Sequence, residues 1–439
     1  TSLKQYFPMG PINKSSKILI LSDSDLYGGA SVAGYTLHQS LRANGFQSFM
    51  IVNNKISKDR TVIQKESSAK KKWINNLIEG RWNFPFSYRI GILTRRMNSN
   101  FNEWYNSSLI ERYNLSNPNF FSVLKFKPDV IHFNTGGGNN IFDLRDIKIL
   151  SHYYKVVFSL HDLWILSKPP PLVLYKNIKH ASNYKFHQIN QSKINFISHS
   201  KWVYNNFLNT NETQYSPINH IKYSININKF KSKDKTQIRK KFKIPKSVFV
   251  IMTTAVGILS NPFKDFKTLY NAYTSILRKR KDFLLIAVGD KASNLNSQKF
   301  SKHFIFTNPS PQSEELIEYY SCADLYIQSS NIETWGLAIS EALSCGLPVI
   351  ASSVGAIPEQ IKGFNRGNTN DPLNFYSINK ANGLLFEKNN EQSLYEMIMW
   401  MFLNKNKMRL LSNNARSFAK KELDLNNSVS KYIDYYNSL

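Results

Sequence analysis

The sequence predicts an α/β protein built from two doubly wound domains that face each other across a cleft. Short apolar runs alternate with Gly- or Ser-bearing turns and helical stretches along most of the 439 residues, and this rhythm restarts after about residue 230. Continuous apolar strands that alternate with helices are typical of a parallel sheet covered on both faces. A chain of this length also exceeds a single hydrophobic core, which favours two domains.

The first set of strands opens with KILILS (17–22), which a glycine-bearing turn joins to an amphipathic helix that stops at Gly45. The runs that continue this set are QSFMIVN (47–53), DVIHFNTGGG (129–138), KVVFSLHD (155–162) and INFISHS (194–200). The region 65–113 is basic, aromatic and irregular, and it fits the rhythm poorly.

The second set of strands follows a charged stretch, NKFKSKDKTQIRKKFKIPKS, that begins at Asn228. Its members are VFVIMTTAVG (248–257), FLLIAVGD (283–290), HFIFTN (303–308), ADLYIQSS (323–330), PVIASS (348–353) and GLLFEK (383–388). We therefore expect domains at 1–228 and 229–419. A C-terminal helix, 420–439, is expected to return to the first domain.

Charge and cysteine content limit the classes of partner and compartment. The formal net charge of +27 attracts nucleic acid, anionic membranes or phosphate-bearing substrates. No RNP, KH or helix-turn-helix pattern is present, so nucleic acid is not expected as a partner. Cys322 and Cys345 are the only cysteines, which excludes a disulfide framework and favours a reducing compartment. With no span of ~20 apolar residues and no apolar signal core, we expect a cytoplasmic protein, with a peripheral site on the inner membrane face as a further option.

The segment 70–97, KKKWINNLIEGRWNFPFSYRIGILTRRM, interleaves cations with Trp and Phe. Cationic amphipathic segments bind anionic interfaces, so this segment could contact an anionic membrane surface or a lipid-linked acceptor. A solvated surface loop is the equally weighted alternative.

The segment 329–361 carries the pattern with the clearest chemistry. A strand ends at Ser329, a loop presents Glu333, and a helix that begins near Gly336 carries Glu341. A helix start has free backbone N–H groups and a dipole that favours an anion. The residues whose N–H groups lie at this start are Thr334, Trp335, Gly336 and Leu337. A bound diphosphate would have a carboxylate on each side, although both Glu residues could instead only cap or solvate the helix.

This segment resembles the donor-site signature of family 4 retaining glycosyltransferases, which have the GT-B fold of two Rossmann-like domains. The resemblance rests on Glu333, seven residues, Glu341, and the run EALSCGLPVIASSVGAIPE. It implies a nucleoside diphosphate sugar bound by the C-terminal domain, with Glu333 on sugar hydroxyls and Glu341 on ribose hydroxyls. It also implies retention of anomeric configuration, no required metal and no separate cofactor. The acceptor would be a glycan or a lipid-linked molecule, in the synthesis of a cell-surface polysaccharide or glycoconjugate.

The first domain resembles the acceptor side of the same family. SDSDLYGGASVAG is similar to the family's glycine loop, in which Gly28 and Gly29 would let the backbone approach the donor phosphates and the acceptor. SLHDLW (159–164) is similar to the family's His-Asp turn, which implies that His161 lies over the donor sugar near the reacting centre. A structural hydrogen-bonding role for His161 is the alternative. The DSD at 23–25 lies in the glycine loop, which argues against a metal-binding Asp-x-Asp.

One departure from the family pattern concerns the diphosphate. The run AVGILSNPFKDF keeps Lys264, which would stabilise the charge on the leaving phosphate, but has Ile258 where the family generally has Arg. Phe263 stands where some relatives have a second Arg. One charge-assisted contact is therefore missing. A sugar-nucleotide epimerase of the same fold, or a catalytically weak carbohydrate-binding relative, are the alternatives to a transferase.

Overall fold

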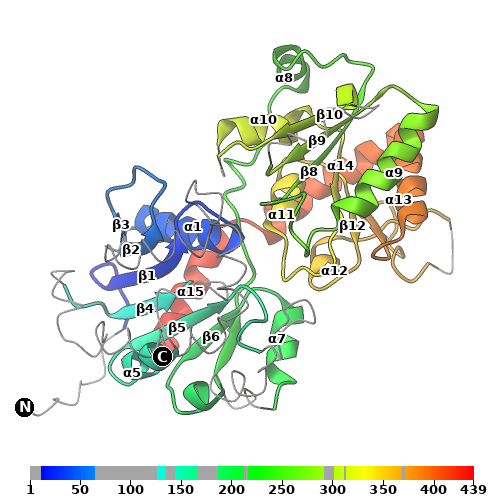
Figure 1. The fold of residues 1–439 in the computed structure, drawn as a ribbon. Helices are drawn as coiled ribbons and strands as arrows, with labels where there is room; N and C mark the ends of the chain where they lie inside the picture. The colour runs from blue at the N-terminus through cyan, green and yellow to red at the C-terminus, as the bar shows by residue number, and fades with distance from the viewer. Residues whose placement is uncertain are drawn as a thin grey trace, which may run out of the picture.

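The computed structural model describes residues 11–64, 126–134, 144–166, 186–211, 213, 216–290, 301–310, 313–367 and 371–439. The cationic segment 70–97 lies outside the described residues. Figure 1 shows two α/β domains joined near the middle of the molecule. Within the described residues, no helix combines the length and hydropathy that a membrane-spanning segment needs.

The N-terminal domain contains a parallel sheet of seven strands in the order β3-β2-β1-β4-β5-β6-β7. Its strands are β1 (Lys17–Ser24), β2 (Gln47–Asn54), β3 (Val62–Gln64), β4 (Val130–Phe133), β5 (Lys155–Leu160), β6 (Asn195–Ser198) and β7 (Ile218–His220). The helices described with this sheet are α1 (Gly29–Ala43), α5 (Leu144–Ser151), α7 (Lys201–Leu208) and α15 (Asn426–Ser438). The order reverses direction between β1 and β4, where doubly wound folds bind ligands.

The C-terminal domain repeats this topology with six strands in the order β10-β9-β8-β11-β12-β13. Its strands are β8 (Phe249–Thr254), β9 (Phe283–Val288), β10 (Phe304–Thr307), β11 (Leu325–Gln328), β12 (Val349–Ser352) and β13 (Gly383–Phe386). Its helices are α8 (Lys235–Lys241), α9 (Phe266–Lys279), η1 (Ser301–His303), α10 (Glu314–Cys322), α11 (Leu337–Ser344), α12 (Ile357–Gln360), α13 (Glu391–Leu403) and α14 (Lys405–Glu422). The expectation of two doubly wound sheets is confirmed.

Each sheet is buried on both faces because successive side chains of a strand point in opposite directions. In β1, Leu19 and Leu21 pack with α5 and α7, whereas Ile18 and Ile20 pack in a second layer with α1 and α15. This arrangement explains why the strands are apolar runs without alternation.

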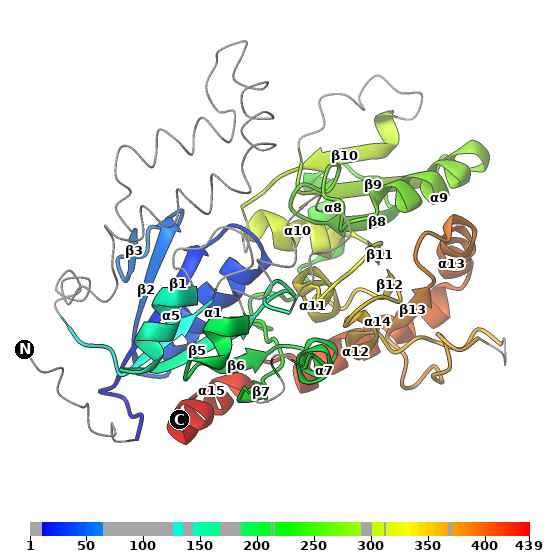
Figure 2. The ribbon, with the colours of Figure 1, turned by 60° about the horizontal axis from the view of Figure 1, so that its bottom comes forward.

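The last helix returns to the N-terminal domain, as expected. Figures 1 and 2 both show α15, in red, against the first sheet. The hydroxyl of Tyr436 lies 2.7 Å from Nδ1 of His132, and the hydroxyl of Tyr435 donates to the carbonyl of Phe196 at 3.0 Å. The return begins later than residue 420, because α14 continues to Glu422 with Ala419 buried in the C-terminal core.

Two chain segments connect the domains side by side. The segment after β7 carries Ile225, whose N–H donates to the carbonyl of Leu423 at 2.9 Å and whose carbonyl accepts from the N–H of Leu425 at 3.1 Å. Lys222 and Glu422 form an ion pair beside them, with a 2.9 Å separation. The expected boundary near Asn228 lies between β7 and α8, just beyond this two-stranded hinge.

Candidate functional site

The loop between β11 and α11, residues 331–336, is called the anion loop here. Within the described part of the chain, no group accepts a hydrogen bond from the backbone N–H of Thr334, Trp335, Gly336 or Leu337. Gly336 has φ of 92°, and a Cβ on it would come within 3.2 Å of Ile339 and 3.3 Å of Glu333. Glycine therefore allows the loop to turn tightly into α11 and leaves an anion-binding helix start.

The buried side chain of Trp335 holds this loop against the core of the C-terminal domain. It is 1% exposed, and its Nε1–H donates to Oγ of Ser340 at 3.0 Å. Nε2 of Gln360 donates to the Trp335 carbonyl at 2.6 Å. Only the backbone of Trp335 can therefore face a ligand, as the sequence analysis assumed.

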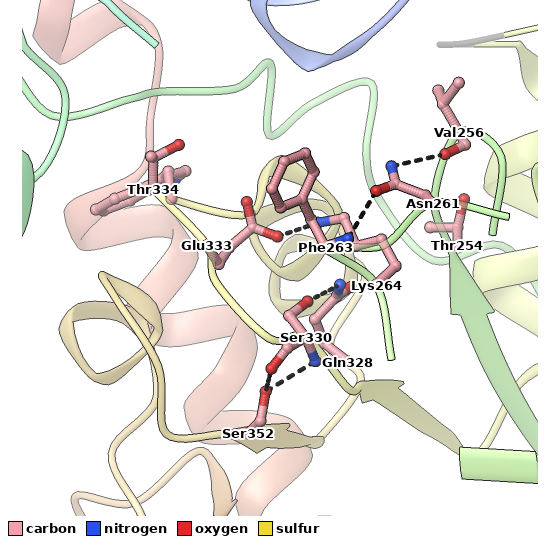
Figure 3. A network of polar contacts seen from close by, with 12 residues as sticks. Thr254, Val256, Asn261, Phe263, Lys264, Gln328, Ser330, Glu333, Thr334 and Ser352 are labelled. Carbon is pink, nitrogen blue, oxygen red and sulfur yellow. Dashed lines mark hydrogen bonds and ion pairs between the residues drawn. The ribbon is translucent and has the colours of Figure 1, made fainter. Parts of the chain in front are cut away.

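Glu333 forms an ion pair with Lys264 at the edge of the anion loop (Figure 3). Lys264 lies on the loop between β8 and α9, which the N–H of Asn331 ties to the anion loop by donating to the carbonyl of Phe263 at 3.0 Å. Behind Glu333, its carbonyl accepts from the N–H of Ala356 at 2.9 Å, and a Cβ on Gly355 would overlap that carbonyl. The glycine of the GAIPE run is thus needed for close backbone contact. The pair places a cation beside the free N–H groups, where a phosphate would gain charge-assisted contacts.

Glu341 lies one turn further along α11 and is nearly fully buried. Burial raises the pKa of Glu341 to about 7, against the opposing effects of a hydrogen bond from Tyr320 and the charge of Lys229. The Tyr320 hydroxyl donates to Oε2 of Glu341 at 2.8 Å. Glu341 also lines a cavity of about 180 Å³ between α1, α11 and the interdomain segment. Its environment differs from that of Glu333, which is paired with a cation.

The glycine loop of the N-terminal domain abuts the start of α11. Gly28 has φ of 84° and precedes α1, and Gly29 is the first residue of that helix. A Cβ built on Gly29 would lie 3.7 Å from Cδ1 of Leu337. The structure thus brings Gly29 next to the side chain of Leu337 at the start of α11, although the two residues were predicted from separate motifs.

His161 lies at the same boundary, but both of its ring nitrogens already have protein partners. Nε2 is 2.8 Å from Oδ1 of Asn134, and Nδ1 contacts the hydroxyl of Tyr223. The His161 carbonyl accepts from Oγ1 of Thr334 at 2.7 Å. Burial, together with the nearby His199 and His132, lowers the pKa of His161 well below its usual value. The ring is therefore neutral, and its hydrogen bonding matches the structural alternative for this residue; its contact with a donor sugar stays a prediction.

Sequence reasoning missed three residues that join the two halves of the site. Asn134 and Tyr223 flank His161, and Glu359 crosses between the domains. The Glu359 carboxylate accepts from the N–H of Lys201 at 2.9 Å and of Trp202 at 2.8 Å, at the start of α7. Glu359 belongs to the quoted GAIPE run, but no local signal identifies its partner 157 residues away.

The structure also describes three residues from the discounted or departing motifs, namely Ile258, Phe263 and Asp25. Ile258 is 3% exposed, whereas Phe263 is 40% exposed beside Lys264. The carboxylate of Asp25, from the DSD run, accepts from the N–H groups of Ile56 and Ser57, both at 2.8 Å. Asp25 thus fastens the loop after β2.

Residues 234–418 match the family described as Glycosyl transferases group 1. The C-terminal domain belongs to the glycosyl transferases of group 1. This confirms the resemblance drawn from the Glu333–Glu341 segment, which lies within the matched residues.

Several known proteins are similar to this chain, one in sequence and two in fold. Glycogen synthase of Clostridium beijerinckii is 24% identical over 228 residues, which cover 49% of this chain and 44% of that protein. Sucrose-phosphate synthase from Thermosynechococcus elongatus has a TM-score of 0.65 at 15% identity, over 96% of this chain and 98% of that one. HepE from Anabaena, in complex with UDP-glucose, has a TM-score of 0.59 at 16% identity, over 95% and 99%.

The structural likenesses extend over both domains and establish the GT-B fold. The sequence likenesses are shorter: the first three curated relatives are matched over 11% to 44% of their own length.

Proposed function

We propose that this protein is a retaining glycosyltransferase that moves a sugar from a nucleoside diphosphate sugar to a glycan or lipid-linked acceptor. The observation that carries the proposal is the row of N–H groups from Thr334 to Leu337, which have no acceptor among the described residues, with Lys264 beside it. Glu333 and Glu341 flank this row on its two sides. Membership of the C-terminal domain in the group 1 family supports the proposal, as does the fold shared with a UDP-glucose complex.

In the proposed reaction the donor diphosphate binds the free N–H groups and Lys264. Glu333 then accepts hydrogen bonds from the sugar hydroxyls while its partner Lys264 is shared with the phosphate. As the bond between the anomeric carbon and the phosphate oxygen breaks, its electron pair goes to the phosphate, and the nearby donors stabilise that charge. The acceptor hydroxyl attacks from the same face and gives its proton to the departing phosphate. Gly28 and Gly29 allow the backbone to approach the phosphates, and closure of the domains excludes water.

A donor screen tests the proposal. Free nucleotide is measured for a set of UDP-, GDP-, ADP- and dTDP-sugars, with and without candidate acceptors, in excess chelator. Acceptor-dependent release in chelator is expected from the wild type and not from Lys264→Met. Isomerisation of the donor without acceptor would identify an epimerase, and binding without turnover a weak carbohydrate-binding relative. Loss of activity in chelator, restored by Mg²⁺ or Mn²⁺, would contradict the metal-free reaction.

The partners and place of this reaction are proposals from the sequence. A cell-surface polysaccharide or glycoconjugate, made at the inner face of the membrane, would bring the acceptor to a cationic protein. The segment 70–97 would contact the anionic surface. Sedimentation with vesicles tests this: binding to anionic but not neutral vesicles, weakened by salt, is expected. A variant with the cations of this segment neutralised that binds as well as wild type would contradict it.

A further inference from the structure

The side chain of Asn134 joins the glycine loop to His161. Asn134 follows β4 and is 3% exposed. Its Nδ2 donates to the carbonyl of Ala30, in the first turn of α1, at 2.7 Å. Its Oδ1 is 2.8 Å from Nε2 of His161. One amide group therefore contacts two parts of the candidate site that are 131 residues apart in the chain.

The Ala30 carbonyl determines the orientation of every hydrogen bond that follows. A carbonyl can only accept, so Asn134 must turn its amide nitrogen toward Ala30 and its oxygen toward His161. That oxygen also can only accept, so Nε2 of His161 must carry the ring hydrogen. Nδ1 then has a lone pair and must accept from the hydroxyl of Tyr223. Burial raises the pKa of Tyr223 well above its usual value, so this hydroxyl keeps its proton.

Gly34 provides the space that Asn134 occupies. A Cβ on Gly34 would overlap the amide nitrogen of Asn134. Gly34 lies within α1, where glycine costs helix stability relative to alanine. The space needed by the Asn134 side chain explains why a glycine stands at position 34, although it weakens the helix.

Contacts continue from His161 to the interdomain segment and to the anion loop. Tyr223 belongs to the interdomain segment, and its ring lies 6.2 Å from that of Trp335 in the anion loop. The His161 carbonyl accepts from Thr334, whose N–H is one of the free donors. Asn134 therefore stands at the centre of a continuous set of contacts from the glycine loop to the anion loop.

We propose that Asn134 is a positioning residue that holds His161 in the single tautomer with hydrogen on Nε2 and aligns the glycine loop with the anion loop. Gly34 is part of the same device because it admits the Asn134 side chain. The consequence for catalysis rests on the proposed glycosyl transfer; the consequence for the His161 tautomer does not.

The test compares four full-length proteins: wild type, Asn134→Ser, Gly34→Ala and the control Asn206→Ala. Asn206 is half-buried in the N-terminal domain, and its amide, like that of Asn134, donates to a backbone carbonyl, that of Trp202 at 2.8 Å; it lies outside this set of contacts. Nitrogen NMR of ¹⁵N-histidine-labelled protein, with His161→Gln to assign the signal, reports the tautomer. The wild type and Asn206→Ala should show hydrogen on Nε2, and Asn134→Ser and Gly34→Ala should show both tautomers or the other one.

Kinetics provide the second measurement. We expect kcat for transfer to fall about 10- to 100-fold in Asn134→Ser and Gly34→Ala, since small displacements at a reacting centre have effects of this size. The Kd for the nucleoside diphosphate should change less than about two-fold, because its proposed side-chain and N–H contacts, Lys264, Glu341 and the anion loop, are in the other domain. An unchanged His161 signal in both variants would overturn the proposal, as would equal kcat in the variants and the control. If the wild type transfers no sugar, the proposed function fails while the NMR comparison still decides the role of Asn134.

Discussion

We predict that the buried carboxyl of Glu341 makes nucleotide binding sensitive to pH. Burial raises its pKa to about 7, so the group is uncharged below that pH and charged above it. Ribose hydroxyls donate more strongly to the charged form, and affinity for a nucleoside diphosphate should therefore rise as the pH increases through 7. Calorimetric titrations of wild type and Glu341→Gln measure this, since Gln cannot ionise and should remove the Glu341 contribution.

The exposed carboxylate of Glu396 supplies a matched control, and Glu396→Gln should keep the wild-type pH dependence. Glu341→Ala should weaken nucleotide binding by about 1–3 kcal/mol, the range for a lost hydrogen bond to a charged group. Wild-type affinity in that variant would remove the ribose assignment.

Phe263 is a better position than Ile258 for an arginine that would bind the proposed donor diphosphate. Phe263 is 40% exposed beside Lys264, whereas Ile258 is 3% exposed. Phe263→Arg should strengthen binding of a nucleoside diphosphate by about 1.5–3 kcal/mol through a charge-assisted contact. Ile258→Arg should instead lower the free energy of unfolding, because an unpaired charge is costly in an apolar site.

Binding isotherms and urea unfolding of both variants separate these effects, with Phe263→Leu as the control for loss of the ring. Weaker nucleotide binding by a folded Phe263→Arg would show that another group already occupies the phosphate position.

At the level of single residues, the sequence predicted which groups belong to the candidate anion site but not which of them contact one another. Glu333, Lys264 and the helix-start N–H groups were identifiable because each belongs to a compact run. Glu333 lies 69 positions from Lys264, and Tyr223 lies 62 positions from His161. The other partner of His161, Asn134, lies at the end of a different strand. No periodicity carries that information.

Among the helices, α7 depends on a carboxylate from the opposite domain. The N–H groups at its start donate to Oγ of Ser200 and to the carboxylate of Glu359, and Glu359 comes from α12. Glu359→Ala should destabilise the start of α7 by about 0.5–2 kcal/mol, as loss of a helix cap does. It should also loosen domain closure, because that contact spans the two domains.

Two quantities measure the loosening: the radius of gyration from small-angle scattering and the rate of donor hydrolysis without acceptor. Both should rise in Glu359→Ala. Glu387→Ala changes an exposed carboxylate of the same domain and serves as the control. Equal scattering profiles for the two variants would show that Glu359 acts only within α7.

The long elements were predicted well, and the short ones were not. Each strand of four or more residues coincides with an apolar run in the sequence, since burial on both faces leaves a strong signal. The edge strands β3 and β7 have three residues each, which is too few for a pattern. The start of α15 was placed too early because its separation from α14 is a bend at Leu423 that no Gly or Pro marks.

For the molecule as a whole, buried neutral histidines predict loss of stability in acid. Burial lowers the pKa of His38 and His199 to about 4 and that of His132 to about 3, from an ordinary value of 6.5. Between these values the unfolded chain binds more protons than the folded one, so the free energy of unfolding falls as the pH drops below 6.5. Each histidine contributes roughly 3 kcal/mol by pH 4. The raised pKa of Glu341 acts in the opposite direction, but it is a single group.

Urea unfolding at a series of pH values measures this dependence. His38→Gln should reduce the slope with pH, and substitution of the exposed His152 should leave it unchanged. Unfolding free energies that stay constant between about pH 4.5 and 7.5 would contradict the assignment of buried neutral rings.

The return of α15 has a consequence for the order in which the two domains fold during translation. Tyr432 and Tyr436 complete the core of the first sheet, but the ribosome delivers them after the entire second domain. At about 5–20 residues per second, the roughly 200 residues between β7 and α15 occupy about 10–40 s of translation. During that time one apolar face of the first sheet is covered by α1 but lacks α15. The second domain can therefore finish folding before the first, and the nascent chain is a predicted client of chaperones that shield apolar surface.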